Sequence, residues 1–565
     1  RGGNERRGPR DTPPAAMPAP MPGGGAVAAP AAPAAPSPFT PPRTGTRVGV
    51  EMQAETDASW RVMEDATIDV IMARETILEM AREVVAGTAV EVDAELPITL
   101  HLMPAINAEI IGEALRQVAL PAPQQPVRTK FLARAKAAGR VRVDVELWQN
   151  RMRLGGIQLN TRAVAAGIPP VAAPPVVASG TVAPSGARRA PVDVLRVSED
   201  PSQPPAGTSI RYDISFDAIV RPPEARGQGY SPQLTRERRA YMDGIYTRIQ
   251  DRWEDSARDA AAFADDLRAI GLDLWNAIVP EKVQALLWER RDSLDVLQVL
   301  TTEAYVPWEL VFINEPGRRT AHKDGRFLGE LGMVRWVYGS EGTGFAPMSL
   351  RWGRMKVVQP DYAIAGDVLP AAKAEADFLV QRYGAERVAA EAKAIHDLVK
   401  ARGSGTWDVL HYCGHGEAEA ASIEGASLRL QTTIVDGAPK DQRLYADTIR
   451  TTAELREPDD VESPGHIVLL NACQAGRSGE LLSGFGGFAQ AFVQGGAGLF
   501  VAPLWSVGDQ LASTFVEAFY ASLAGGRSVA EATRDARTAA RDAGDATWLA
   551  YAVYGEPTAR IAMGT

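Results

Sequence analysis

The C-terminal half of the chain alternates short apolar runs with longer stretches in which apolar residues recur at helical spacing. The four apolar runs are RMKVVQ (354–359), WDVLHYC (407–413), HIVLLNA (466–472) and AGLFVAP (497–503). Strands that are apolar on both faces and separated by helices are typical of a parallel sheet covered on both sides. We therefore predict an α/β fold, with functional groups gathered beyond the carboxyl ends of the strands.

A second region with a mixed strand and helix pattern precedes this one. Residues 210–216 alternate apolar and polar side chains as a strand does, and residues 232–288 show helical spacing. LDVLQVLTT (294–302) predicts a further strand. The pattern therefore indicates that the α/β structure begins at about residue 205.

Residues 48–160 have a different pattern, which predicts a small α+β module. Apolar residues recur at helical spacing from Trp60 to Ala86, whereas residues 96–102 and 141–147 alternate as half-buried strands. His101 stands on the polar side of the first of these strands and is expected to be solvated. Because the segment offers no catalytic group, we expect it to recognise or dock a protein partner.

Two Pro/Ala-rich stretches flank this module. Residues 1–47 and 161–191 hold 18 of the chain's 40 prolines. Such a composition buries too little apolar surface to offset the entropy lost on ordering. We therefore expect a disordered tail at 1–47 and a linker at 161–204.

Composition narrows the class of protein. The formal net charge of −10 argues against a nucleic-acid-binding function, and two cysteines in 565 residues exclude a disulfide-bonded scaffold. No apolar leader is readable, so we expect a reducing, cytoplasmic location. The long uncharged run between Glu480 and Asp509 is interpreted as a buried helix followed by a buried strand, the alternative being a membrane span.

Two strand ends carry the candidate chemistry. His415 and Gly416 lie just past the strand at 407–413, and Cys473 lies at the tip of the strand at 466–472. If the strands are neighbours, the imidazole can take the proton of the thiol and later pass it to a leaving amine. The backbone N–H groups of Gly416 and Cys473 are then oxyanion donors. This arrangement predicts a Cys-His hydrolase.

Each of these residues has an alternative interpretation. Cys473 could be a small buried apolar residue, and we interpret Cys413 in that way because it lies inside its strand. His411, Cys413 and His415 alternate along the chain and could form a zinc site. No CxxC or HExxH motif accompanies them.

Several motifs together resemble one known family. WDVLHYCGHGE, IVLLNACQAG, GGAGLFVAPLWSVGD and TWLAYAVYGEP are similar to the CHAT domain, a group of caspase-like cysteine peptidases related to separase. TTEAYVPWELVFI and GRFLGELGMVRWV are similar to the amino-terminal half of that family, a caspase-like lobe without catalytic residues. The resemblance covers roughly residues 205–565. It implies a caspase-like catalytic lobe at 351–565, with a mostly parallel, helix-covered sheet, preceded by a pseudo-caspase lobe at 205–350.

The resemblance also implies a role for each residue of the candidate site. His415 is the general base and acid, Cys473 the nucleophile and Gly416 part of the oxyanion hole, with no cofactor. Relatives that cut after basic residues often have an acidic residue two positions before the cysteine, where this chain has Asn471. Asn471 is therefore a candidate substrate contact, without an implied preference for Arg or Lys.

Three further residues are candidate substrate contacts. Asp509 could supply the charge of the specificity pocket or cap the helix that follows it, and Trp505 could wall the pocket or belong to the core. Glu417 could orient the base or meet a basic substrate, with a solvated loop carboxylate as the alternative. Ser528 and Glu531 match a capping box, which predicts a helix start rather than a catalytic role.

The function predicted from these residues is a caspase-like cysteine endopeptidase that cleaves protein substrates or itself. Family analogy implies a role in bacterial defence or regulated cell death, with residues 48–160 recruiting an activating protein partner. Neither nucleic acid nor a membrane is expected as a partner. The alternatives are a catalytically inactive scaffold that binds proteins through the same cleft, and a metal-binding protein.

Overall fold

The computed structural model describes eighteen stretches of the chain. Residues 1–45, most of the predicted tail, lie outside them. The described residues are 46–75, 84–165, 176–182, 191–199, 212–216, 227–232, 238–256, 259–302, 306–338, 344–400, 406–419, 422–435, 438–456, 463–472, 479–481, 484–505, 509–544 and 548–562. Residues 44–565 cluster as one compact unit.

A large, mostly parallel sheet organises the C-terminal region. Its strands are β12 (Asp193–Glu199), β13 (Tyr212–Phe216), β14 (Gly227–Tyr230), β15 (Val296–Thr301), β18 (Gly332–Val337), β20 (Met355–Val358), β21 (Glu386–Val388), β22 (Val409–Cys413), β26 (His466–Asn471), β29 (Ala497–Pro503) and β30 (Tyr551–Gly555). They lie in the order β14-β13-β12-β15-β18-β30-β29-β26-β22-β20-β21. Pairing is parallel from β12 to β30 and from β29 to β21, whereas β29 and β30 are antiparallel. The predicted α/β fold is confirmed.

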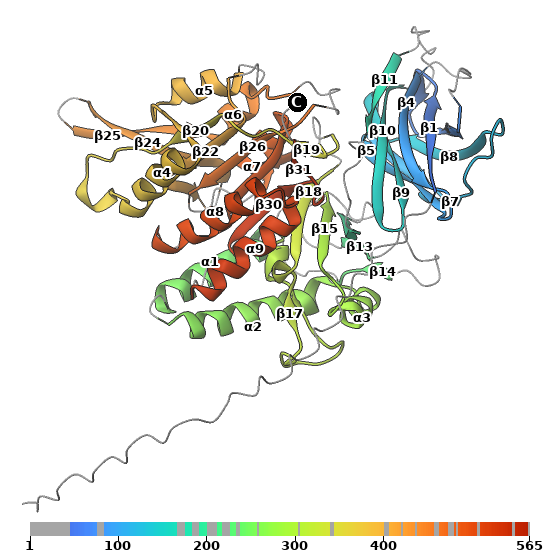
Figure 1. Cartoon of the computed structure of the whole chain (residues 1–565). Helices are drawn as coiled ribbons and strands as arrows, with labels where there is room; N and C mark the ends of the chain where they lie inside the picture. Colours follow the sequence, from blue (N-terminus) through green and yellow to red (C-terminus); the bar gives the residue numbers. More distant parts are fainter. Residues whose placement is uncertain are drawn as a thin grey trace, which may run out of the picture. The chain divides into compact units, whose positions relative to one another are not determined.

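Helices cover both faces of this sheet. They are α1 (Arg238–Ser256), α2 (Ala260–Ile278), α3 (Glu281–Arg290), α4 (Pro370–Tyr383), α5 (Ala392–Lys400), α6 (Ala446–Thr452), α7 (Phe488–Gln494), α8 (Asp509–Ala524) and α9 (Val529–Asp542). Helices α4, α8 and α9 lie in a row on one face, and α5, α6 and α7 on the other (Figure 1). Every side chain of β22, β26 and β29 is buried, as expected for strands covered on both faces.

Short strands and 3₁₀ turns complete the region. The small sheets pair β16 (Phe312–Ile313) with β17 (Arg326–Phe327), β19 (Ser349–Leu350) with β31 (Arg560–Ile561), β23 (Gly416–Glu419) with β24 (Ser422–Val435) and β25 (Ala438–Tyr445), and β27 (Gly479–Leu481) with β28 (Gly484–Gly486). The 3₁₀ turns are η2 (Trp308–Leu310), η3 (Leu328–Glu330) and η4 (Ala365–Asp367). The turn η4 precedes α4 and becomes part of the candidate site.

Two local predictions are confirmed. The hydroxyl of Ser528 accepts the Glu531 backbone N–H at 3.3 Å, and the Glu531 carboxylate accepts that of Ser528 at 2.8 Å, which starts α9 with a capping box. The uncharged run after Glu480 contains the buried helix α7 and the buried strand β29. Among the described residues, no helix combines the length and apolar character that crossing a bilayer requires.

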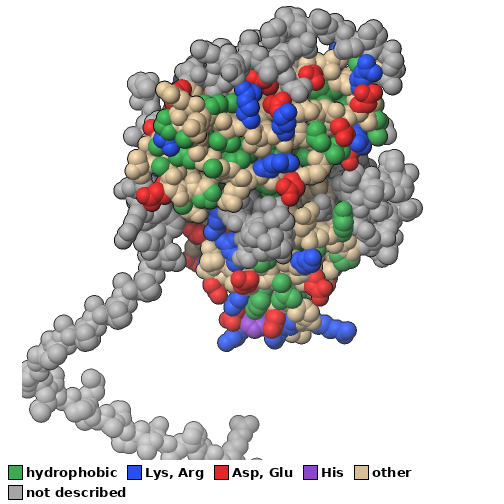
Figure 2. Space-filling view, turned by 90° about the vertical axis from the view of Figure 1, so that its right-hand side faces the viewer, with side chains coloured by type: hydrophobic (Ala, Val, Ile, Leu, Met, Phe, Trp, Pro, Cys, Tyr) green, Lys and Arg blue, Asp and Glu red, His purple; other side chains and the backbone are tan. Residues whose placement is uncertain are grey.

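The N-terminal module is built on a sheet of its own. Its strands are β1 (Arg47–Thr56), β2 (Ser59–Arg61), β3 (Asp65–Ala73), β4 (Val84–Asp93), β5 (Ile98–Ile106), β6 (Ala108–Ile111), β7 (Leu115–Val118), β8 (Val127–Ala135), β9 (Gly139–Gln149), β10 (Met152–Val164) and β11 (Val176–Val182). They follow the order β6-β8-β3-β1-β4-β11-β10-β9-β5-β7, with β2 beside β10. The module has a separate apolar core. On the face shown in Figure 2, basic and acidic side chains are interspersed.

The helix predicted from Trp60 to Ala86 is wrong. The described residues of this stretch contain β2, β3 and the start of β4, so the described part of the module has strands and no helix and is all-β, not α+β. Strand β3 buries Ala66, Ile68 and Val70 on one face and pairs with β1 and β8. Its dense β-branched residues favour a strand, and the matches at helical spacing were coincidental.

The predicted linker at 161–204 also contains strands. Residues 161–164 end β10, and β11 pairs in parallel with β4 and antiparallel with β10. Residues 193–199 form β12, which belongs to the large sheet. Non-local pairing therefore orders short segments within a Pro/Ala-rich composition, and the α/β region begins earlier than predicted.

His101 is buried rather than solvated, contrary to expectation. It lies opposite Glu146 in the pairing of β5 with β9, and its Nδ1 is 3.0 Å from Glu146 Oε2. Burial raises the pKa of Glu146, but the hydrogen bond from His101 and the charge of Arg153 outweigh it and lower the pKa to about 2. The cross-strand partner, invisible in the local sequence, determines the environment of this histidine.

Candidate active site

The candidate site lies where β22 and β26 end side by side. The two strands pair in parallel, with Cys413 opposite Asn471, and the Gly414 N–H donates to the Asn471 carbonyl at 3.2 Å. His415 and Cys473 each stand two residues beyond this pair. Cys473 belongs to residues 473–478, which lie outside the described residues. The ends of both strands are described, and so are the contacts of His415 with Asp367 and Tyr362.

His415 is held by a backbone carbonyl. Its Nε2 lies 2.8 Å from the carbonyl oxygen of Asp367, the last residue of η4. Because a carbonyl only accepts hydrogen bonds, Nε2 carries a proton, and in the neutral ring Nδ1 has the lone pair. The backbone N–H of His415 donates to the Tyr362 hydroxyl at 2.9 Å, and the two rings lie 4.9 Å apart. This geometry prepares Nδ1 to accept a proton.

An arginine holds Asp367 in turn. Arg429, on β24, donates to Asp367 Oδ2 at 2.7 Å and through Nε to Asp441 Oδ2 at 2.8 Å. Burial lowers the pKa of Arg429, but its hydrogen bonds to Asp367 and Asp441 outweigh this and raise the pKa above its ordinary value. The turn that contacts His415 is thus tied to the hairpin β24–β25.

The glycine before His415 leaves room for two tyrosine hydroxyls. The Tyr412 hydroxyl oxygen lies 2.9 Å from the His415 carbonyl oxygen and 2.5 Å from that of Arg429. A Cβ on Gly414 would stand 2.7 Å from the Tyr412 hydroxyl and 2.8 Å from that of Tyr362. The space around the His415 backbone therefore requires glycine at position 414.

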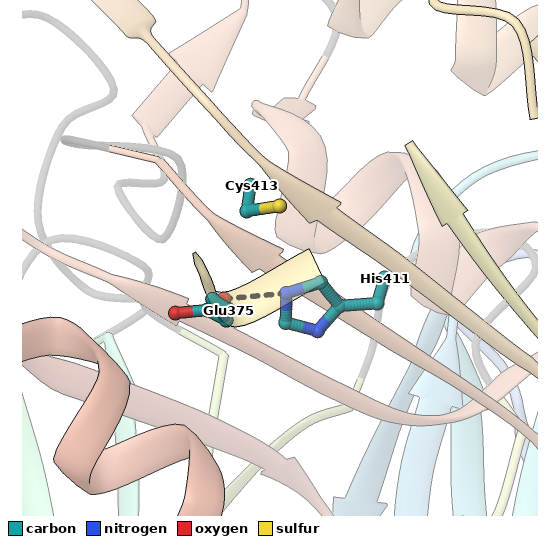
Figure 3. A group of neighbouring side chains, drawn as sticks. All are labelled: Glu375, His411 and Cys413. Carbon is teal, nitrogen blue, oxygen red and sulfur yellow. Dashed lines mark hydrogen bonds and ion pairs between the residues drawn. The ribbon is translucent and has the colours of Figure 1, made fainter. Parts of the chain in front are cut away.

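A buried hydrogen-bonded chain runs just below these strand ends. Glu375, on α4, accepts from His411 Nε2 at 2.7 Å (Figure 3) and from Asn471 Nδ2 at 3.0 and 2.8 Å. His411 Nδ1 is 3.0 Å from the Tyr520 hydroxyl, and the Asn471 amide oxygen accepts from the Tyr551 hydroxyl at 2.9 Å. We call these five side chains the buried chain; none is more than 8% exposed.

The possible metal ligands that the structure brings together differ from the predicted set of His411, Cys413 and His415. Ligand atoms of Glu375, His411 and Cys413 lie within 4.8 Å of one another, whereas the imidazole of His415 is turned to the Asp367 carbonyl. Both Glu375 oxygens already accept hydrogen bonds, and Cys413 Sγ is 3.3 Å from the Ala372 carbonyl. The cluster therefore fits a hydrogen-bonded core, and Cys413 is buried as expected for a core residue.

The remaining predicted residues are placed only in part. Gly416 opens β23, and Glu417 follows it with a side chain outside the described residues. Trp505 is 2% exposed, as a core residue is. Helix α8 begins at Asp509, and the contacts of that side chain also lie outside the described residues. Their substrate contacts, and the oxyanion role of Gly416, stay predictions.

Sequence reasoning missed the residues that support the predicted ones. Asp367, Arg429 and Glu375 lie in motifs without any catalytic pattern. Asp367 acts through its backbone carbonyl, which every residue type has. Glu375 is an ordinary helix residue until the packing of α4 buries it, so the local sequence carried no signal for either.

Two family models match the chain. Residues 347–556 match the CHAT domain, and residues 54–159 match a domain of unknown function, DUF7363. The second match covers most of the N-terminal sheet. No curated protein matches the chain.

Solved structures give weak similarities. Two crystal structures of the separase-securin complex of Saccharomyces cerevisiae match at 10% identity, with TM-scores of 0.41 and 0.34, covering 65% and 66% of this chain and 30% of each matched chain. A structure described only as that of a protease matches at 12% identity and a TM-score of 0.29, over 53% of this chain and 69% of the other. The family match, which spans both strands of the candidate site, identifies residues 347–556 as a CHAT domain.

Proposed function

We propose that this protein is a caspase-like cysteine endopeptidase with His415 and Cys473 as its catalytic dyad. The observation that carries the proposal is the register of β22 and β26, in which Cys413 lies opposite Asn471. Parallel strands in register send the residues two positions further to the same edge of the sheet. The CHAT match over the same strands supports this assignment.

The reaction follows from the tautomer of His415. Its Nδ1 accepts the Sγ proton of Cys473, and the thiolate bonds to the carbonyl carbon of the scissile peptide. The C–N bond breaks as the imidazolium returns the proton to the leaving nitrogen, which leaves a thioester. Water then attacks the thioester, His415 takes a water proton and returns it to the departing sulfur, and the acid product is released.

Backbone donors complete the proposed site. The N–H groups of Gly416 and Cys473 stabilise the oxyanion that forms on the carbonyl oxygen. Asp509 and Glu417 are the proposed contacts for the substrate side chain before the scissile bond, whereas Trp505, at 2% exposure, fits the core alternative. The chemistry requires only a protein or peptide substrate and no cofactor.

The broader biology remains part of the proposal. Residues 48–160 would bind a protein partner that activates or recruits the enzyme, and the chain would act in the cytoplasm, in bacterial defence or regulated cell death. These assignments rest on the sequence predictions and family analogy.

Mapping of new protein termini tests the proposal. Wild type, Cys473→Ala and His415→Ala are each incubated with a proteome, and the termini are identified by mass spectrometry. We expect termini that both variants fail to produce. If all three proteins give the same termini, the proteolytic function is wrong. Folded wild type that also fails to react at Cys473 with a thiol-directed peptide probe would instead be a binding scaffold.

A further inference from the structure

We propose that Glu375 is a positioning residue for the dyad, an inference that rests on the proposed function. Its carboxylate binds the two strands that carry the catalytic residues. His411 stands four residues before His415 on the same segment, and Asn471 stands two residues before Cys473. One buried side chain thereby links the two strand ends, whose register is given by their backbone pairing.

The hydrogen bonds leave little freedom in this arrangement. A carboxylate only accepts and a carbonyl oxygen only accepts, so the Asn471 amide must turn its NH₂ to Glu375 and its oxygen to the Tyr551 hydroxyl. Both ends of the amide are thus occupied inside the protein. We assign Asn471 to positioning Cys473 rather than to the substrate contact predicted from the sequence.

Tyr520 and Tyr551 stand at the two ends of the buried chain, and helix α8 contributes to the packing of both. The Tyr551 ring stacks on Phe515 of α8 at a centroid distance of 3.9 Å and an angle of 4°. Tyr520, also on α8, is fully buried beside His411. Burial and the nearby Glu375 raise the pKa of Tyr520 well above its ordinary value, so the hydroxyl keeps its proton. Helix α8 therefore holds both ends of the buried chain, since Tyr520 belongs to it and Tyr551 stacks on it.

The segment made of η4 and α4 contacts His415 as well as the two strands. Asp367, whose carbonyl accepts from His415 Nε2, ends η4 just before α4, and α4 carries Glu375. A shift of Glu375 would therefore disturb both Asn471, at the end of the strand before Cys473, and the segment that contacts His415. Misplacement of reacting groups by about 1 Å can cost about 100-fold in rate, so a positioning role has a measurable consequence.

Replacement of Glu375 by Gln tests the inference without opening a cavity. Because Asn471 donates to both Glu375 oxygens, the new NH₂ group would face the Asn471 NH₂ in either orientation, and a donor would oppose a donor. The matched control is Glu309→Gln, which alters another buried carboxylate, one that binds Arg335 on β18. A second variant, Tyr551→Phe, removes only the hydroxyl that holds Asn471.

Each protein is assayed by iodoacetamide alkylation of Cys473 against pH, by kcat and KM on a peptide that wild type cleaves, and by thermal unfolding. Peptide mass spectrometry separates Cys473 from the buried Cys413. For folded Glu375→Gln we expect kcat to fall at least tenfold with a smaller change in KM, and the alkylation profile to move to higher pH. Tyr551→Phe should likewise lower kcat and move the alkylation profile to higher pH. Glu375→Asp, which keeps a carboxylate, should retain more of the wild-type kcat than Glu375→Gln.

The control should lose thermal stability and keep the wild-type alkylation profile. If Glu375→Gln and Tyr551→Phe retain the wild-type kcat and alkylation profile, the positioning role is wrong. If wild type itself cleaves nothing and Cys473 titrates like an ordinary thiol, near pH 8.5, the proposed function fails and this inference fails with it. If Glu375→Gln does not fold, Tyr551→Phe decides alone.

Discussion

The Nε2 of His415 donates to the backbone carbonyl oxygen of Asp367 over 2.8 Å, which directs the other ring nitrogen to the proposed chemistry. Asp367 is itself held by Arg429. The orientation of the proposed base therefore depends on the ion pair between Arg429 and Asp367.

Arg429→Met should lower kcat about three- to tenfold with little change in KM, because the turn η4 loses the charge that holds it against His415. Steady-state kinetics on a peptide substrate measures both values. Arg387→Met is the control, since the ion pair of Arg387 with Asp377 is half exposed and such pairs contribute little. Equal kcat values for wild type and Arg429→Met would contradict the prediction.

Gly414→Ala should destabilise the protein by about 1–3 kcal/mol and abolish cleavage, because the added Cβ meets two tyrosine hydroxyls. Urea unfolding and a cleavage assay measure the two effects. Gly244→Ala, in α1, has no atom within 4 Å of the added Cβ and should stabilise the helix by about 0.5–1 kcal/mol. A Gly414→Ala protein with normal stability and activity would refute the crowding argument.

His466→Phe should remove part of the loss of stability in acid. Burial, and then the charge of Arg351, lower the pKa of His466 from 6.5 to about 4, although Asp408 opposes this. Between these two pH values the unfolded chain binds a proton at His466 that the folded protein does not. The free energy of unfolding is therefore unaffected by this group above pH 6.5 and decreases as the pH falls towards 4.

The loss is on the order of 2 kcal/mol at pH 5. The measurement is urea unfolding of both proteins between pH 4 and 8. We expect the curve of His466→Phe to be flatter below pH 6.5, since Phe keeps the contact with Trp407, whose ring lies 4.4 Å away. Parallel curves would show that His466 does not titrate as described.

Glu309→Gln should cost about 3–5 kcal/mol, because it leaves a buried guanidinium without its counter-ion. Glu309 accepts from Arg335 Nε at 2.8 Å and lies 3.9 Å from Arg537. Burial lowers the pKa of Arg537 to about 10, although Glu309 opposes this. Denaturant unfolding measures the cost, and Glu315→Gln, which breaks an exposed pair with Arg318, should cost less than about 1 kcal/mol. Similar costs for the two variants would contradict the burial argument.

Local patterning is enough to predict the strands that lead to the candidate site. The segments that form β22 and β26 are mostly apolar because both faces of the sheet are covered. Such short apolar segments are a recognisable sign of a buried parallel strand. The capping box of Ser528 and Glu531 is also local, since its two hydrogen bonds span three residues. Where burial or pairing depended on distant segments, as for β3, β11 and His101, the sequence predictions were wrong.

The supports of the proposed dyad became visible only in the tertiary structure. Asp367 is 48 residues from His415, and Glu375 is 36 residues from His411 and 96 from Asn471. A histidine and a cysteine at strand ends have recognisable chemistry, so the sequence alone makes them candidates for catalysis. A glutamate or a backbone carbonyl acquires its role from the donors that packing brings to it and from the water that packing removes.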